Sequence, residues 1–259
     1  MRDAEESFEP GDPVERCPEI ARARLLDGIS VFLPCHNEEG NVERVVNALS
    51  VELPLIAEDY QIVIVDDGSA DRTGIIADRL AATDLRIKAV HHQNNHGYGA
   101  AVISGVRACT QPWVVLCDGD GQFDANDIGT LAAKVPAYDV VVGYRVNRAD
   151  SLMRRINGKS WTLLIRLFLD IHIKDLDCGL KLFKRELLED VQLRAKGAMI
   201  SAELMAQVIG RGAKICEIEV KHLPRVAGKQ TGANFNVIIR AFRELFLLRR
   251  GLREIRRRA

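Results

Sequence analysis

The sequence has few aromatic residues, no surplus of charge of either sign and no long apolar run. Of its 259 residues 5% are aromatic, and 36 Lys and Arg are balanced by 36 Asp and Glu. A dedicated nucleic-acid-binding domain usually carries a basic surplus, so this balance argues against one. No stretch approaches the roughly 20 apolar residues that span a bilayer. Residues 1–19 are acidic and lack an apolar segment, so we expect no signal peptide there.

The six cysteines are scattered and form no Cys-x-x-Cys pair, which argues against a structural zinc site. Cys35, Cys117 and Cys216 lie in apolar runs, so we expect them to be reduced core residues. With 47% apolar and 28% charged residues, the composition is that of a globular protein. It excludes a collagen-like structure, a disulfide scaffold and disorder of the whole chain. The length allows one large α/β domain or two small ones.

Short apolar runs alternate with segments of helical periodicity between residues 28 and 145. The expected strands are residues 29–33, 60–65, 86–91, 113–117 and 139–143, and the expected helices are 39–51, 71–80, 98–108 and 126–134. Because these strands are almost wholly apolar, the pattern predicts a mostly parallel sheet with helices on both faces. Beyond them we expect helices over 151–170, 201–209 and 234–258 and strands over 179–183 and 214–220.

The same pattern divides the chain into three regions. Residues 1–27 are acidic and contain three prolines, which predicts a flexible tail or a loosely docked arm. Residues 28–233 form the α/β domain, and residues 234–259 a basic amphipathic helix. Ligands of open parallel sheets bind beyond the carboxyl ends of the strands, and polar residues gather at four such ends. These polar segments are 36–38, 66–67, 94–95 and 118–120.

Asp118-Gly119-Asp120 directly follows an apolar strand and is the strongest local signal. Two carboxylates one residue apart can point the same way, and their oxygens suit Mg²⁺ or Mn²⁺, which also take phosphate oxygens as ligands. Gly119 would let a diphosphate approach the backbone closely, and Gln122 is a candidate further ligand. A solvated acidic turn explains the motif equally well when it is taken alone, because turns favour Asp and Gly.

Asp66 and Asp67 end another expected strand and precede Gly68 and the start of a helix. Carboxylates at a strand end accept hydrogen bonds from ribose hydroxyls or a base N–H in dinucleotide folds. For Ser69 and Asp71 the alternative is a helix N-cap, which leaves the two preceding acids unexplained.

His91 and His92 are adjacent in an expected strand and therefore face opposite sides of the sheet. We interpret them as rim or core histidines rather than metal ligands. Gly97 and Gly99 permit a tight entry into the next helix. Val102 stands where a dinucleotide-binding fingerprint would need a third small residue.

The polar segments, in their order, resemble glycosyltransferase family 2, the inverting enzymes of GT-A fold that use nucleotide sugars. The matching segments are Pro34-Cys35-His36-Asn37-Glu38, Val65 to Thr73, Asn95 to Ala101, Asp118 to Gln122 and Gly143-Tyr144-Arg145. The sequence is most similar to the dolichol-phosphate mannosyltransferase-like, polyprenyl-phosphate branch. The resemblance continues through Asp177 to Phe183 and Glu203 to the segment Pro224 to Lys229. It implies a Rossmann-like single domain with a mostly parallel central sheet.

The resemblance also implies roles for individual residues. Asp118 and Asp120, assisted by Gln122, would hold Mg²⁺ or Mn²⁺ on the diphosphate of the donor. The donor site as a whole would be lined by Pro34, Asn37, Glu38, Asp66, Asp67, Gly97, Asp118 and Gly119. Arg145 and one of Arg154 or Arg155 would face the donor or acceptor phosphates, and Arg225 and Lys229 would close over the donor.

The implied reaction moves a sugar from GDP-mannose or a UDP-sugar to a polyprenyl phosphate, with inversion at the anomeric carbon. The metal and nearby arginines would stabilise the departing diphosphate. A phosphate acceptor is already anionic and needs no strong base, whereas a hydroxyl acceptor needs one, for which Asp177 is the candidate. Transfer to a soluble hydroxyl acceptor, such as a metabolite or glycan, and nucleotide binding without turnover stay open as alternatives.

The segment 234–259 bears on the acceptor, because it combines an apolar stripe with a basic, arginine-rich face. Such a helix either lies on an anionic membrane surface and presents a polyprenyl phosphate, or docks its apolar side on the α/β domain. We therefore expect a cytoplasmic protein that, in the first case, is peripheral on the inner face of the membrane.

Overall fold

The computed structural model of the chain describes residues 14–16, 26–146, 165–166, 168–169, 171–195, 197 and 199–227. Its strands are β1 Val14–Arg16, β2 Leu26–Cys35, β3 Ala57–Asp66, β4 Ile87–His91, β5 Trp113–Cys117, β6 Val140–Val146, β7 Leu180–Lys184 and β8 Ile215–Lys221. Its helices are α1 Val42–Ile56, α2 Thr73–Thr83, α3 Tyr98–Ala108, α4 Asn126–Ala132 and α6 Met199–Gly210, with a 3-10 turn at Arg185–Leu187.

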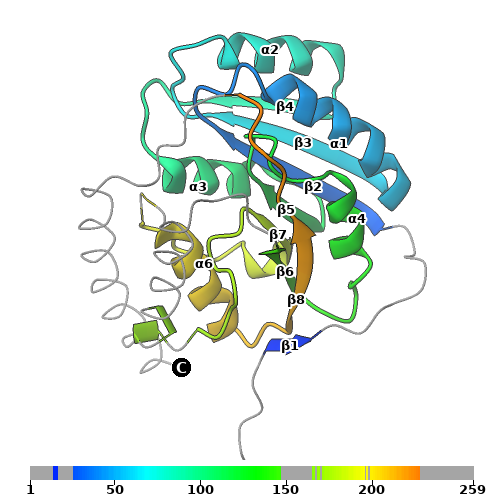
Figure 1. Cartoon of the computed structure of the whole chain (residues 1–259), viewed down its shortest axis with the longest axis vertical. Helices are drawn as coiled ribbons and strands as arrows, with labels where there is room; N and C mark the ends of the chain where they lie inside the picture. Colours follow the sequence, from blue (N-terminus) through cyan, green and yellow to red (C-terminus); the bar gives the residue numbers. More distant parts are fainter. Residues whose placement is uncertain are drawn as a thin grey trace, which may run out of the picture.

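The strands form a single sheet in the order β1-β8-β6-β7-β5-β2-β3-β4 (Figure 1). The pairs β2–β3, β2–β5, β3–β4, β6–β8 and β1–β8 are parallel, whereas β7 runs antiparallel between β5 and β6. The mostly parallel sheet predicted from the apolar strands is thus confirmed.

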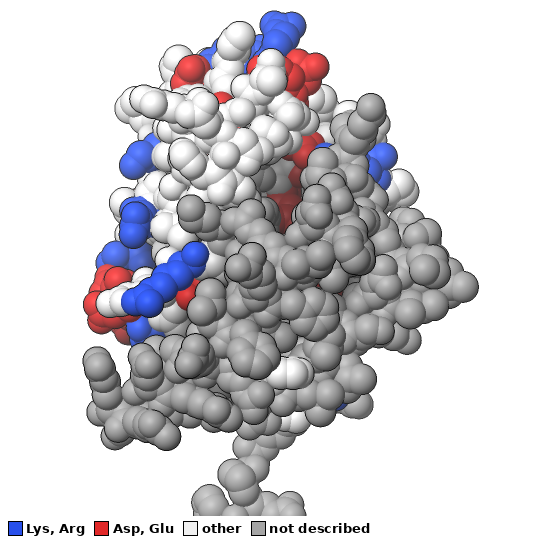
Figure 2. Space-filling model, turned by 90° about the vertical axis from the view of Figure 1, so that its left-hand side faces the viewer, with Lys and Arg blue, Asp and Glu red and all other residues white. Residues whose placement is uncertain are grey.

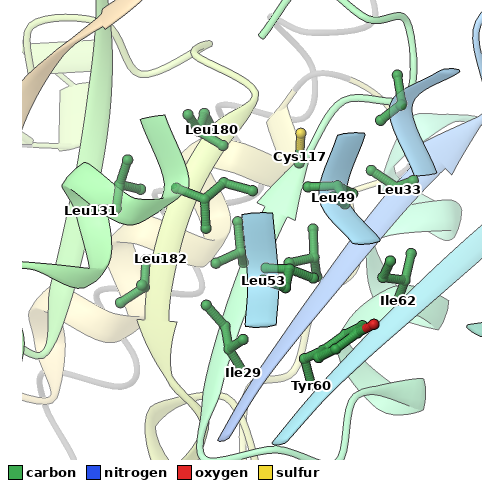
Figure 3. Packing of buried hydrophobic residues seen from close by; sticks show 14 of the residues in the cluster. Ile29, Leu33, Leu49, Leu53, Tyr60, Ile62, Cys117, Leu131, Leu180 and Leu182 are labelled. Atoms are coloured by element: carbon green, nitrogen blue, oxygen red, sulfur yellow. The ribbon is translucent and has the colours of Figure 1, made fainter. Parts of the chain in front are cut away.

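Two apolar clusters hold the layers together, one on each face of the sheet. Successive residues of a strand point to opposite faces, so Leu33 belongs to one cluster and Phe32 to the other. Figure 3 shows the first cluster, where Leu49 and Leu53 of α1 lie over the strands near Leu33 and Ile62. The second cluster packs α3 and α6 against the other face. Burial on both faces explains why the strands read as continuous apolar runs.

Several elements differ from the sequence-based expectation. The helix expected from residue 39 begins at Val42, because the carbonyl of Glu38 first closes a turn with the N–H groups of Asn41 and Val42. The segment 1–27, in which the sequence predicts no strand, contributes β1, and β2 already begins at Leu26. Short edge strands such as β1 have too little periodicity to be recognised in the sequence.

The expectation for the cysteines is confirmed at two positions and wrong at a third. Cys35 and Cys117 are buried free thiols, as predicted. Cys216 is also fully buried, but it is disulfide-bonded.

Two expected helices fall mainly or wholly outside the described residues. Of the helix expected over 151–170, positions 165–166 and 168–169 are described and are helical. The basic helix expected over 234–258 lies outside the described residues altogether. Within the described part of the chain, no helix combines the length and the hydropathy required to traverse a bilayer.

Candidate active site

The carboxyl ends of the neighbouring parallel strands β5, β2, β3 and β4 meet at one edge of the sheet. Cys35 at the end of β2 pairs with Asp66 of β3, which in turn pairs with His91 of β4. The loops that follow these strands therefore lie side by side, as the four polar segments predict. Figure 2 shows acidic side chains gathered in a hollow on one side of the molecule.

Asn37 ties the first two loops of this edge together. It adopts a left-handed backbone conformation with φ 57°, which asparagine tolerates better than most residues. Its backbone N–H donates to the Ser69 hydroxyl at 2.9 Å, and its side-chain oxygen accepts from the N–H of Ala70 at 2.9 Å. The next N–H, of Glu38, donates to Oγ1 of Thr73 at 2.8 Å. These bonds hold the segment after β2 against the start of α2.

Asp67 shapes the loop between β4 and α3. Its buried carboxylate accepts hydrogen bonds from the backbone N–H of His96 at 2.9 Å and of Gly97 at 2.8 Å. Nδ1 of His92 lies 2.6 Å from the same carboxylate. Gly97 has φ 94°, a conformation that favours glycine, and it directly precedes α3 as its N-cap residue. Asp67 and Gly97, both predicted to line the donor site, are therefore in direct contact.

Asp66 faces a different set of partners. It accepts a hydrogen bond from the N–H of Ser69 at 3.0 Å and lies 3.2 Å from Nδ1 of His91. Nε2 of His91 lies 2.9 Å from Asp78. Burial lowers the pKa of His91, but its hydrogen bonds to Asp78 and Asp66 outweigh burial and raise it. His91 and His92 thus contact different aspartates, as expected for adjacent residues of a strand.

Asp118 and Asp120 follow β5 at the centre of this edge. The phenol of Tyr98, at the start of α3, donates to Oδ1 of Asp118 at 2.9 Å. The carboxylate lies directly over Gly179, where any Cβ atom would overlap with it. Burial first, and then the charge of Asp120, raise the pKa of Asp118 to about 6. The two carboxylates therefore lie close enough to repel each other, which is the arrangement that a cation would relieve.

Gly119 is required by the packing of its own loop, and the close approach of a diphosphate that the sequence predicts at this residue stays a prediction. A Cβ atom at this buried position would overlap with Sγ of Cys35 and lie 3.1 Å from the carbonyl oxygen of Pro34. The N–H of Gly119 also lies 3.4 Å from that carbonyl. Glycine is needed here so that the loop after β5 can pack against the end of β2.

The donor set at this edge fits a hard divalent cation. Asp118 and Asp120 offer carboxylate oxygens, the ligands that Mg²⁺ and Mn²⁺ prefer. Within the described residues, no group of three or more His, Cys, Asp or Glu side chains is arranged to hold a metal. A cation here would therefore complete its shell with water or phosphate oxygens, which is how Mg²⁺ is usually bound.

A segment after β8 crosses the site, and we call residues 223–227 the strap. In Figure 1 it is the orange coil that leaves β8 and passes over the ends of β5 and β2. Gln122 holds its start, because the carbonyl of Gln122 accepts from the N–H of Leu223 at 2.8 Å and its side-chain amide donates to the carbonyl of Leu223 at 3.1 Å. Asn41 donates to the carbonyl of Ala227 at 3.2 Å.

Arg225 places a positive charge from the strap between two acids of the site. Its guanidinium donates to Oε1 of Glu38, to Oδ2 of Asp120 at 3.4 Å and to the carbonyl of Ala227 at 2.7 Å. Burial raises the pKa of Glu38, although its hydrogen bond with Asn41 and the charge of Arg225 oppose that effect. The structure thus brings together Glu38, Asp120 and Arg225, which the sequence places far apart.

Arg145, at the end of β6, is fixed by a residue that the sequence does not single out. Asp175 accepts from Nε of Arg145 at 2.7 Å, from Nη2 at 2.8 Å and from its backbone N–H at 3.2 Å. The Arg145 side chain is 11% exposed and the Asp175 side chain 12%, so this bidentate ion pair is well shielded from solvent. Of the other predicted phosphate-facing cations, Arg154, Arg155 and Lys229 lie outside the described residues.

The loop before β7 and the strand itself contribute two more charged groups. Asp177, the candidate base, contributes to the electrostatic surroundings of Tyr98 and Arg145. Lys181 is fully buried, and its ammonium donates to the carbonyl of Cys178. Burial lowers its pKa. The signal in the sequence that could have revealed this buried cation is a lysine inside the otherwise apolar run 179–183.

Comparison with protein families shows which family the chain belongs to. Residues 30–192 match the model described as glycosyl transferase family 2. The chain belongs to this family. The resemblance inferred from the ordered motifs is thereby confirmed.

Curated relatives of the chain include three larger glycosyltransferases. Glycosyltransferase AglD of Haloferax volcanii is 30% identical over 225 residues, which cover 83% of this chain and 36% of AglD. The undecaprenyl-phosphate 4-deoxy-4-formamido-L-arabinose transferase of Aeromonas hydrophila is 27% identical, over 78% of this chain and 61% of the transferase. The dodecaprenyl-phosphate galacturonate synthase of Rhizobium johnstonii is 27% identical, over 85% of this chain and 67% of the synthase. The chain thus spans between 36% and 67% of the length of these relatives.

Solved structures confirm the predicted GT-A fold. Glucosyl-3-phosphoglycerate synthase from Mycobacterium tuberculosis, in complex with Mn²⁺ and UDP-glucose, superimposes with a TM-score of 0.65. The match covers 87% of this chain and 79% of the synthase, at 20% sequence identity. At this identity the similarity concerns the fold.

Proposed function

We propose that the protein transfers a sugar, with inversion, from a nucleoside-diphosphate donor to a polyprenyl phosphate and depends on Mg²⁺ or Mn²⁺. The observation that carries this proposal is the carboxylate pair Asp118 and Asp120 at the carboxyl end of β5, with Arg225 reaching Asp120 from the strap. Membership of glycosyltransferase family 2 and the polyprenyl-phosphate substrates named for two of the relatives support it.

On the donor side, the residues divide into groups by position. Asn37, Asp66 and Asp67 connect the loops after β2, β3 and β4, and we assign the nucleoside to this part of the edge, with Pro34 and Gly97 at its border. Asp118 and Asp120 would hold the cation on the diphosphate, with Gln122 beside them. The bound cation supplies Lewis-acid stabilisation of the leaving diphosphate.

Arg225 would give up its contact with Asp120 for a contact with the donor diphosphate, and it would keep its contact with Glu38. In the structure its guanidinium contacts Glu38 and Asp120. Asp120 would hold the divalent cation in place of its contact with Arg225, and the Arg225 guanidinium would donate to a diphosphate oxygen, a charge-assisted contact that would strengthen as negative charge develops on the leaving group. Glu38 would then keep Arg225 aligned.

On the acceptor side, we assign the phosphate to Arg145, whose charge reaches the site and opposes the burial that raises the pKa of Asp118. Asp175 takes two of the five guanidinium N–H groups, and we assign the others to the acceptor. A phosphate oxygen attacks the anomeric carbon without prior loss of a proton at neutral pH, so no base is needed. A polyprenyl phosphate resides in a membrane, and we therefore propose that the protein works at a membrane surface on the cytoplasmic side.

Product analysis with two acceptor types tests this proposal. The chain is incubated with Mn²⁺ and GDP-mannose or a UDP-sugar, and with undecaprenyl phosphate in detergent or 3-phosphoglycerate. We expect one donor to raise the melting temperature and to give a lipid-linked sugar with equimolar nucleoside diphosphate, and EDTA to stop the reaction. Product only with 3-phosphoglycerate would show that the acceptor is wrong, and no stabilisation by any donor would contradict the donor site.

Replacing Arg225 by glutamine should move the affinities for metal and nucleotide in opposite directions. Among the described residues, Arg225 is the cation that contacts Asp120, so its removal is expected to let bare Mn²⁺ bind more tightly. The lost charge-assisted bond to the diphosphate should weaken nucleoside diphosphate binding by about 10- to 100-fold. Calorimetric titrations with Mn²⁺ alone and then with nucleoside diphosphate measure both.

Arg211→Gln is the matched control for this substitution. Arg211 bonds to the carbonyls of Gln207 and Asp190, away from the carboxyl ends of the strands. Its removal should leave both affinities unchanged. If Arg225→Gln weakened Mn²⁺ binding, the competition between the guanidinium and the cation would be refuted.

A further inference from the structure

The two aspartates of the predicted cation site are held in different ways. Asp118 contacts groups that belong to regular elements: the phenol of Tyr98 at the start of α3 and the backbone of Gly179 just before β7. Asp120 contacts the strap through Arg225 at 3.4 Å and accepts from an N–H of its own loop. Asp118 is thus held by the sheet and by a helix, whereas Asp120 is held by the strap.

The phenol of Tyr98 is itself firmly placed. Tyr98 is the first residue of α3, and the carbonyl of Gly97 before it accepts from the N–H groups of Ala100 and Ala101 at 2.9 Å and 3.2 Å. The N–H of Gly97 is held by Asp67. The ring packs on the apolar cluster that lies between α3, α6 and the sheet. Its hydroxyl group is therefore fixed by the fold rather than by the loop that carries Asp118.

The contacts on the two oxygens of Asp118 restrict its rotation. Oδ1 accepts from Tyr98 at 2.9 Å, and Oδ2 lies against the α-carbon side of Gly179, where no side chain fits. The backbone N–H of Asp118 also donates to the carbonyl of Gly179 at 3.1 Å. A carboxylate bound in this way presents the same lone pairs before and after a cation arrives. Hydrogen bonds from groups behind a ligand typically change metal affinity by 10- to 100-fold.

We propose that Tyr98 is a positioning residue that preorganises Asp118 as the permanent half of the cation site, while Asp120 is the half that the strap controls. This inference rests on the proposed function, because it concerns the cation of the same reaction. The Tyr98 hydroxyl group donates the hydrogen bond to Asp118, so a substitution that removes only this group keeps the aromatic ring packed in the core.

Tyr98→Phe tests the proposal, because phenylalanine keeps the ring and removes only the donor. We expect the affinity for Mn²⁺ alone, measured from the free-ion electron paramagnetic resonance signal, to fall by about 10- to 100-fold. The Mn²⁺ concentration for half-maximal activity should rise by a similar factor, and saturating Mn²⁺ should restore most of kcat. A merely structural role would lower the melting temperature and kcat without this rescue.

Two further variants separate the possible outcomes. Tyr60→Phe is the matched control, because Tyr60 is buried in β3 far from the carboxyl ends and should bind Mn²⁺ normally. Asp118→Asn tests the site itself. If Asp118→Asn loses Mn²⁺ binding and Tyr98→Phe does not, the positioning role is overturned and the proposed function stands. If Asp118→Asn binds Mn²⁺ normally, the cation site of the proposed function is overturned.

Discussion

Asp120→Ala is expected to abolish metal-dependent turnover while the fold survives. The loss should reach about 10³-fold in kcat, since a metal bound at a leaving group contributes several kcal/mol and each 1.36 kcal/mol is a factor of ten. The side chain of Asp120 is 18% exposed and lies on a loop, so little packing is lost. Release of nucleoside diphosphate at saturating Mn²⁺, in the presence of acceptor, measures the effect.

The control for this variant removes an acid elsewhere on the molecule. Asp84 lies just after α2 and bonds to Arg86, at the opposite end of the strands from the candidate site. Asp84→Ala should keep full activity. Unchanged turnover in Asp120→Ala would contradict the assignment of the cation to the pair after β5.

Gly179→Ala should disable the same site without touching either aspartate. The closest atoms to a new Cβ all belong to the Asp118 carboxylate, so the clash is relieved by turning that side chain away. Asp118 would then lose its bond to Tyr98 and its place toward the cation. We expect activity to fall by about 10²- to 10³-fold, the range seen when one preorganised electrostatic contact is removed. The melting temperature should change little, because the group that moves is a side chain.

Gly210→Ala is the natural comparison, because a Cβ atom at Gly210 meets nothing within 4 Å. It should change neither activity nor Mn²⁺ affinity. Full activity of Gly179→Ala would show that the Asp118 carboxylate does not need its observed position. If Gly179→Ala lost both its activity and much of its stability, the clash would be relieved by movement of the backbone at Gly179 and not by rotation of the Asp118 carboxylate.

Much of the fold follows from periodicity and from local signals. The strand 113–117 and the helix 98–108 have the bounds that the apolar pattern predicts. The order of polar segments placed the loops after β2, β3, β4 and β5 at one edge, because parallel strands bring their carboxyl ends together. The same ordered motifs indicated the family to which the chain belongs.

The contacts that organise the site depend on tertiary structure. Arg225 meets Glu38 across 187 positions of sequence and Asp120 across 105. Asp175 fixes Arg145, and Tyr98 holds Asp118, although no spacing rule links either pair. Periodicity in the sequence indicates which side of a helix or strand is buried. Which side chains meet at the site depends on the order of the strands and on where the strap crosses them.

The amino-acid sequence by itself therefore determined the fold class, the family and the polar residues that follow the parallel strands. Only the tertiary structure decided that Gly119 is needed for packing against Cys35, that Gly179 makes room for Asp118, and that Cys216 is disulfide-bonded. The physical reason is that a local pattern encodes hydrogen-bonded elements and their apolar faces. The close approach of one side chain to another arises only when several such elements pack together.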